Sequence, residues 1–199
     1  MGVNLENLDR NIIIDSEINS DLKNDICNKL MDFSKKSFKP INIYLSTNGG
    51  CFYNGLGIID TVNLIRKYGI RINMIASGTI FSMGAIIFLS NPKKYRFITK
   101  NTTVLIHEIR GTIEGTHNVI NSENDEIIRL NKKMQKIILS NLNISKKYLL
   151  KKINNREWYL DYKEFIKLGG GKLLNSPKKL LSSKEKKKLK LLKKLEKMN

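Results

Sequence analysis

SGTIFSMGAIIFLS, residues 77–90, joins the end of an apolar β-branched run to the start of an apolar helical run. The pattern predicts a strand, "IRINMIAS", that ends at Gly78, a turn through Phe81, and a helix that begins at Ser82. Serine before a helical run is a preferred N-cap, and taken alone Ser82 favours that role. In parallel sheets, however, ligands bind where a strand turns into a helix, so a hydroxyl at this place is also a candidate functional group.

Strand-like and helix-like segments alternate on both sides of this stretch. Such alternation over 199 residues indicates one α/β domain with a mostly parallel sheet covered by helices. The other expected strands are residues 11–15, 41–46, 95–99 and 102–109, and the expected helices are 20–36, 54–69, 84–92 and 119–142.

A second glycine turn, "STNGG", ends the strand that precedes this one in the chain. The amide of Gly50 and the amide of Met83 could therefore share one oxyanion at a common sheet edge. Of the two histidines, His107 ends the apolar run "TTVLIH", whereas His117 lies in a polar, glycine-flanked stretch and is expected on the surface. His107 is either a buried imidazole bonded to the backbone or, paired with Ser82, a general base.

These segments resemble the ATP-dependent Clp protease proteolytic subunit (ClpP) family. The resemblance rests on "SGTIFSMGA", on "LIHE" 25 residues beyond Ser82, on "TNGG" before them and on "GLGIIDT" at residues 55–61. It extends over roughly residues 11–174. It implies the ClpP/crotonase-like α/β fold, a spiral of βαβ units with a protruding handle helix within "RGTIEGTHNVINSENDEIIRLNKKMQKIILSNL".

The family's catalytic residues are carried over by the same resemblance. It implies Ser82 as nucleophile, His107 as base, and the amides of Gly50 and Met83 as oxyanion hole, without a metal or organic cofactor. The triad acid is an aspartate in the family, and the alignment of "NNREWYLDYKEF" places Glu157 there. Asp161 is the competitor, and its position predicts a helix cap instead.

The resemblance implies a serine endopeptidase subunit of a self-compartmentalising protease that hydrolyses unfolded polypeptides. The expected partners are copies of the chain or related chains in a heptameric ring or a double-ring tetradecamer, and an AAA+ unfoldase. An alternative is a catalytically impaired subunit that completes a mixed ring, because glutamate replaces the aspartate. A third hypothesis is a basic binding module that grips nucleic acid or an acidic surface.

The net charge of +18 is concentrated near the end of the chain. From Lys172 onward eleven lysines and two glutamates give a net +9, so residues 1–175 are expected to form the peptidase domain and 176–199 a Lys-rich extension, helical or disordered. This concentration argues against a specific nucleic-acid site in the body. No apolar run reaches the length of a membrane span, and no secretory signal is visible. Two isolated cysteines fit a reducing compartment, and the expected location is the cytoplasm or a plastid (apicoplast) stroma.

Overall fold

The computed structural model of the chain describes residues 8–174. This part contains a seven-stranded sheet and six α-helices, with short 3-10 helices at Leu8–Arg10 and Lys93–Tyr95. The strands are β1 (Asn11–Ile14), β2 (Ile41–Thr47), β3 (Ile72–Phe81), β4 (Arg96–Ile98), β5 (Thr103–Ile106), β6 (Trp158–Asp161) and β7 (Lys172–Leu173). The α-helices are α1 (Ser20–Lys36), α2 (Phe52–Lys67), α3 (Met83–Ser90), α4 (His117–Asn141), α5 (Lys146–Ile153) and α6 (Tyr162–Lys167). The predicted Lys-rich extension lies outside the described residues.

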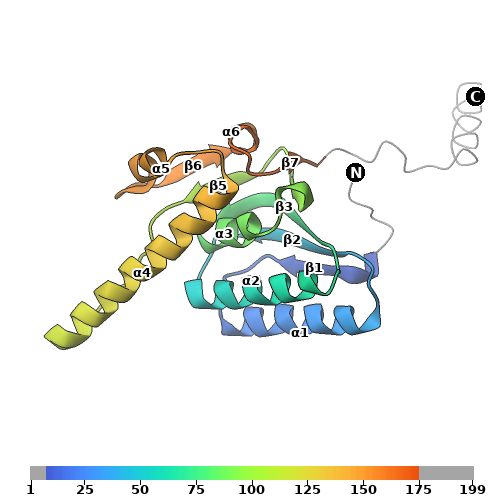
Figure 1. Cartoon of the computed structure of the whole chain (residues 1–199), viewed down its shortest axis with the longest axis horizontal. Coiled ribbons are helices and arrows are strands. Elements are labelled where there is room, and N and C mark those ends of the chain that lie inside the picture. The colour runs from blue at the N-terminus through green and yellow to red at the C-terminus, as the bar shows by residue number, and fades with distance from the viewer. Residues whose placement is uncertain (1–7, 175–199) are drawn as a thin grey trace, which may run out of the picture. The chain divides into compact units, whose positions relative to one another are not determined.

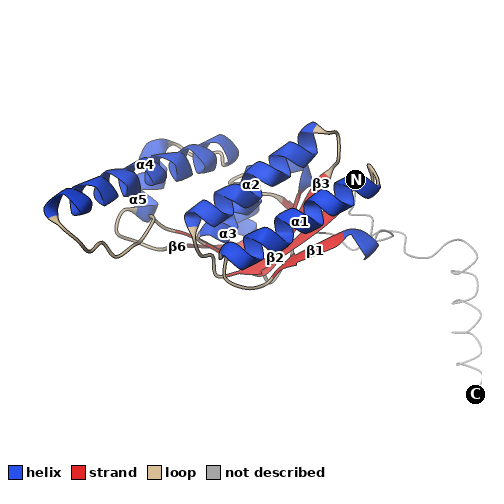
Figure 2. Cartoon of the chain, turned by 90° about the horizontal axis from the view of Figure 1, so that it is seen from below, coloured by secondary structure: helices blue, strands red, loops and turns tan. Residues whose placement is uncertain are grey.

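The first three strands form two successive βαβ units. Strands β1, β2 and β3 pair in parallel, and α1 and α2 connect them on one side of the sheet (Figure 2). Helix α1 begins at the cap Asn19, whose side chain accepts a hydrogen bond from the Leu22 amide, and it buries Ile26 and Leu30 on the sheet side. The predicted alternation of strands and helices is therefore confirmed.

Strand β3 does not end at Gly78 as the sequence predicts, but continues to Phe81. Gly78 has φ of 66°, and the register with β2 shifts between Leu45 and Thr47, so the glycine marks a bulge inside the strand. Before the bulge β3 pairs with β4, and beyond it β3 pairs with β5. The bulge thus divides the sheet into two branches and directs the end of β3 toward α3.

Helix α3 is the most deeply buried helix, and all its residues from Met83 to Leu89 are buried. A helix that is apolar all round belongs in a core. The core around it consists largely of isoleucine and leucine from the strands and from α1 and α2. This packing holds the first turn of α3 in a fixed position.

Helix α4 is long and amphipathic, and its first turns extend away from the sheet (Figure 1). Leu130, Met134 and Ile138, spaced four residues apart, are buried on the side that packs against the body, whereas residues 117–125 are exposed. The predicted protruding helix is confirmed, and it begins two residues earlier than expected.

Arg96 is a buried cation at the start of β4, with 1% of its surface exposed. Its guanidinium donates hydrogen bonds to the carbonyl oxygens of Leu89, Asn141 and Gly169, at 3.3–3.4 Å. These carbonyls lie at the carboxyl ends of α3, α4 and α6, where the helix dipole is negative. Burial lowers the pKa of Arg96 to about 10, so the group is charged at neutral pH.

Candidate functional site

The backbone of Ser82 is strained, with φ of 52° and ψ of −120°. Only two non-glycine residues in the described part of the chain, Ser82 and Asn155, have positive φ. Such a conformation costs of order 1–3 kcal/mol and persists only where the surroundings impose it. Here the Ser82 amide donates to the carbonyl of Leu105 at 2.8 Å, which ties the turn to β5. Ser82 occupies the N-cap position of α3, but its side chain makes no capping hydrogen bond, so capping does not account for the hydroxyl.

The glycine turn after β2 packs directly against this serine. A Cβ added to Gly49, whose φ is 99°, would lie 2.8 Å from the Cβ of Ser82 and 3.2 Å from the amide nitrogen of Met83. Only glycine permits this approach.

Gly50 forms an isolated parallel β-bridge with Ile18. The Ile18 amide donates to the Gly49 carbonyl and the Cys51 amide donates to the Ile18 carbonyl, both at 2.8 Å. Within residues 8–174, neither the amide of Gly50 nor that of Met83 donates a hydrogen bond. Two unbonded donors therefore lie beside Ser82, as an oxyanion hole requires.

His107 follows the last residue of β5 and is half-buried. Its Nδ1 lies 2.5 Å from the carbonyl oxygen of Glu108. A carbonyl oxygen can only accept, so Nδ1 carries a proton, and in the neutral ring the free lone pair lies on Nε2. His107 lines the same cavity as Ser82, although no hydrogen bond joins the two side chains in the described part of the chain. The other histidine, His117, is exposed as predicted.

Glu157 immediately precedes β6, an antiparallel partner of β5. The ladder ends at the pair Ile106–Trp158, so His107 and Glu157 are the next residues beyond it on the two segments, and continuing the register would place them opposite each other. The Glu157 carboxylate accepts a hydrogen bond from the Tyr159 hydroxyl at 2.8 Å and pairs with Arg110 at 3.1 Å. Hydrogen bonds from Tyr159 and then Arg110 lower the pKa of Glu157, so it is ionised at neutral pH. It makes no hydrogen bond to His107 within residues 8–174.

Asp161 is the N-cap of α6. Its side chain accepts from the Glu164 amide at 2.8 Å, and Glu164 accepts in return from the Asp161 amide at 3.1 Å. This is a complete capping box. Asp161 pairs with Thr103 at the far end of the β5–β6 ladder from His107, so the predicted cap is confirmed.

A cavity of about 470 Å³ connects these groups. One wall is apolar, with side chains from α2, α3, the segment after β5, and α4. The lining comprises Glu17, Gly50, Cys51, Phe52, Tyr53, Ser82, Met83, Ile86, His107, Glu108, Ile109, Arg110, Leu130 and Met134. Glu157 does not line it. The cavity therefore brings together Ser82, His107, Gly50 and Met83, the four predicted residues of nucleophile, base and oxyanion hole.

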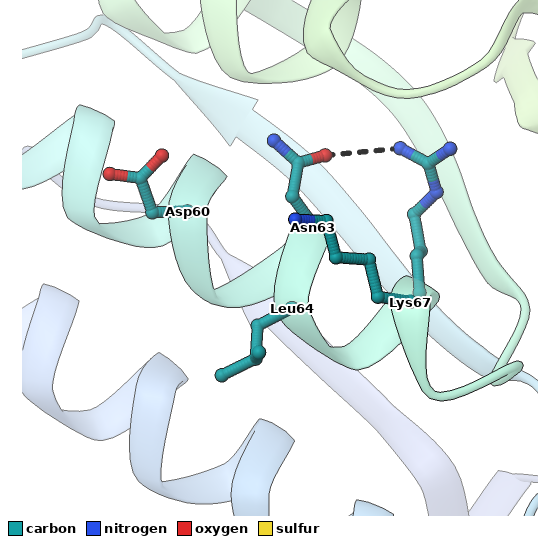
Figure 3. A pocket seen from close by; sticks show the side chains of 5 residues that line it. Asp60, Asn63, Leu64 and Lys67 are labelled. Carbon is teal, nitrogen blue, oxygen red and sulfur yellow. Dashed lines mark hydrogen bonds between the residues drawn. The ribbon is translucent and has the colours of Figure 1, made fainter.

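A larger hollow of about 650 Å³ lies on the outer side of α2, lined by Asp60, Asn63, Leu64, Arg66 and Lys67 (Figure 3). All five residues come from one helix, and Asn63 accepts a hydrogen bond from Arg66 at 3.1 Å. It contains no nucleophile paired with a base. It is therefore the weaker candidate for a catalytic site.

The sequence did not single out Arg110 or Tyr159, the two partners of Glu157. Tyr159 lies two residues beyond Glu157, and residues i and i+2 of a strand point to the same side, so the strand period could have indicated it. Arg110 follows the end of β5, and no local pattern links it to Glu157. Its role depends on the pairing of β5 with β6.

Residues 8–174 contain neither a candidate metal site nor a candidate membrane span. No group of three or more histidine, cysteine, aspartate or glutamate side chains is arranged to hold a metal ion. None of the helices in this range combines the length and apolar character needed to cross a bilayer.

Comparison with known proteins identifies the family. The sequence profile of the Clp protease family matches residues 4–169. The ATP-dependent Clp protease proteolytic subunit 3 of Rhizobium johnstonii is 31% identical over 129 residues, and that of Rhizobium etli is 32% identical over 129. Each match covers 65% of this chain and 65% of the relative.

The fold agrees with a solved relative. The structure of a ClpP1 mutant from Listeria monocytogenes matches with a TM-score of 0.75 and 26% identity, over 84% of this chain and 92% of that one. The predicted ClpP-like α/β fold is confirmed. From its sequence and its fold alike, the chain belongs to the Clp protease family.

Proposed function

We propose that the chain is a serine endopeptidase subunit of a Clp-type protease. The observation that carries the proposal is the strained Ser82, held between the unbonded amide of Met83 and the Gly49–Gly50 turn. A serine at a sharp strand-to-helix turn presents its hydroxyl to a crevice and its following amide to an oxyanion. Membership of the Clp protease family supports this assignment.

The reaction is acyl transfer through a covalent intermediate. Nε2 of His107 removes the proton from the Ser82 hydroxyl, which attacks the peptide carbonyl. The amides of Gly50 and Met83 donate to the oxyanion, and His107 then protonates the leaving amine. Water attacks the acyl-enzyme by the same route in reverse.

Glu157 is the triad acid in this proposal. In the active arrangement its carboxylate accepts a hydrogen bond from the Nδ1–H group of His107, which orients the ring and stabilises the imidazolium. The pairing of Ile106 with Trp158 supports this role, because it brings the two residues to opposed positions. Glutamate is one methylene longer than aspartate, which gives the carboxylate the reach to change partners.

The substrate is an unfolded polypeptide bound in extended form. Its backbone pairs with the exposed strand edges beside Gly50 and after His107. An apolar side chain next to the scissile bond enters the cavity between Met83, Leu130 and Met134. Main-chain pairing selects little sequence, so access to the site has to restrict cleavage.

We propose that assembly provides this restriction. Copies of the chain, alone or with related chains, form a heptameric ring or a double-ring tetradecamer with the sites inside, and an AAA+ ATPase supplies unfolded chains. The names of the Rhizobium relatives, ATP-dependent Clp protease subunits, support an ATPase partner. Residues 1–175 form the peptidase domain, residues 176–199 are an extension, and the location is the cytoplasm or a plastid stroma.

Covalent labelling tests the catalytic proposal. A fluorophosphonate probe is expected to label the wild-type protein at Ser82, and Ser82→Ala and His107→Ala should abolish labelling. Ser122→Ala, an exposed serine on α4, is the control and should label normally. Failure of the assembled wild-type protein to label at Ser82 contradicts the proposal.

A second candidate is a catalytically impaired subunit that completes a mixed ring. One observation favours it: Glu157 pairs with Arg110 and Tyr159, while Nδ1 of His107 donates to the Glu108 carbonyl, so the acid and the base are not joined. In that case Ser82→Ala leaves the activity of a mixed ring unchanged. A peptidase assay of this chain with and without its related chain separates the two candidates.

A further inference from the structure

We infer that Arg110 is a positioning residue that competes with His107 for the carboxylate of Glu157. The inference rests on the proposed function, because it assigns Glu157 as the acid of that site. It concerns a residue that neither the resemblance nor the comparisons single out.

The hydrogen bonds around Glu157 define the competition. One carboxylate oxygen accepts from the Tyr159 hydroxyl at 2.8 Å, and the other lies 3.1 Å from Nη2 of Arg110. Each carboxylate oxygen can accept two hydrogen bonds, so Tyr159 can stay in place while the other oxygen changes partner. Arg110 occupies the oxygen that is not held by Tyr159.

The imidazole of His107 is also hydrogen-bonded to a group other than Glu157. Nδ1 of His107 donates to the carbonyl of Glu108, the next residue in the chain, although the β5–β6 register makes Glu157 its opposed neighbour. A triad needs the Nδ1–H group of the histidine to donate its hydrogen bond to the carboxylate. Both partners of the missing bond are therefore engaged elsewhere, Glu157 by Arg110 and His107 by its own backbone.

Within residues 8–174, no second arginine or lysine lines the cavity. Among its described lining residues Arg110 is the only one of these two types, so no other such side chain on this wall can replace it at Glu157. Arg110 also lines the cavity that receives substrate, so a bound peptide and Glu157 share access to the same guanidinium.

The strength of the Arg110–Glu157 ion pair determines how much kcat should change when Arg110 is removed. The side chain of Arg110 is 63% exposed and that of Glu157 is 37% exposed. An exposed ion pair of this kind changes a population by up to about fivefold. Removing Arg110 should therefore raise the fraction of molecules with Glu157 on His107, and with it kcat, by about three- to fivefold, leaving KM within about twofold.

Steady-state kinetics with a fluorogenic peptide tests the inference. Arg110→Gln should raise kcat, and Arg110→Lys, which keeps the charge without the planar fork, should lie between it and wild type. Lys29→Gln is the matched control, since Lys29 is half-exposed and paired with Asp25 on α1. An Arg110→Gln variant with unchanged or lower kcat overturns the inference.

A double-mutant cycle shows whether Arg110 acts through Glu157. In an E157Q background, R110Q should have no effect on kcat or on the rate of fluorophosphonate labelling at Ser82. A gain that persists without the carboxylate overturns the inference. Loss of labelling in all variants, wild type included, counts against the proposed function. The competition by Arg110 is then decided by the magnetic-resonance measurement below.

Nuclear magnetic resonance detects the hydrogen bond between His107 and Glu157 without an activity assay. The chain has two histidines, so His117→Gln leaves His107 as the only imidazole. In ¹⁵N-histidine-labelled H117Q protein, adding R110Q should bring a low-field Nδ1 proton resonance, as a bond to a carboxylate produces, and E157Q should remove it. The inference fails if that resonance is already as strong with Arg110 present.

Discussion

Gly49 packs so closely against Ser82 that a single added carbon on Gly49 would lie 2.8 Å from the Cβ of the serine. The same carbon would lie 2.8 Å from the carbonyl oxygen of Phe81. The two turns that supply the proposed oxyanion hole are thus fitted to each other through one glycine, and this contact can be tested by substitution.

Gly49→Ala should reduce kcat/KM about 100-fold or more. The methyl group displaces the Gly50 amide from Met83, and misplacing one oxyanion donor has a cost of this order. Gly69→Ala is the control, because Gly69 has a similar φ of 85° but open space around its Cα. It should lower the unfolding midpoint without lowering kcat/KM, and equal kinetic losses in both variants would contradict the steric argument.

Ser82→Gly should make the protein more stable while abolishing peptidase activity. Glycine adopts φ of 52° without strain, and the relief of about 1–3 kcal/mol exceeds the added chain entropy of about 0.5–1 kcal/mol. The net gain in the free energy of unfolding should be about 1 kcal/mol. Denaturant unfolding measures the stability of both variants. Ser82→Ala is the comparison, because it loses the hydroxyl but keeps the backbone strain. The argument fails if Ser82→Gly is less stable than Ser82→Ala.

Replacement of Arg96 by Met should lower the free energy of unfolding by about 2–3 kcal/mol. The change leaves the carbonyls of Leu89, Asn141 and Gly169 without their donor in a buried place. Chemical denaturation measures the loss. Arg156→Met, the same change at an exposed position, should be within about 0.5 kcal/mol of wild type.

The link between α2 and α4 should weaken in acid. Glu126 accepts hydrogen bonds from Arg129 and from the Tyr53 hydroxyl, which together lower its pKa to about 2. A carboxyl whose pKa is depressed on folding contributes stability above its ordinary range near pH 4.5, and that contribution disappears as the pH falls toward 2.

Thermal unfolding between pH 5 and about 2 checks this prediction. The difference in unfolding midpoint between wild type and Glu126→Gln should be largest near pH 5 and should shrink as the acid end is approached. Glu123→Gln, on the exposed part of the same helix, is the control. A difference that grows toward low pH would show that the assigned bonds do not set the titration of Glu126.

The sequence was sufficient for the parts of the site that depend on local order along the chain. Ser82, the glycine turn and His107 each end or follow a strand of the same sheet, and parallel strands bring such ends to one edge. Their shared cavity could therefore be predicted from strand order alone. The assignment of Glu157 as the proposed triad acid depends on the resemblance, since no local pattern separates Glu157 from its neighbours.

Two features could not be predicted from local pattern. Strand β6 has only four residues, too few for alternation to distinguish it from the start of a helix, and its antiparallel pairing with β5 is set by packing of the whole carboxyl-terminal part. Glycine usually marks a turn, so the sequence predicts that the strand ends at Gly78. In the structure β2 on one side, and β4 and β5 on the other, keep the chain extended through a bulge.

The order in which the proposed triad occurs along the chain has a consequence for biosynthesis. Ribosomes release a polypeptide amino end first, and domains fold as they emerge. Ser82 and His107 leave the ribosome before Glu157, which is brought to the end of β5 next to His107 only when β6 has paired with β5. A nascent subunit thus carries the proposed nucleophile and base without the proposed acid until the segment around Glu157 has emerged and paired.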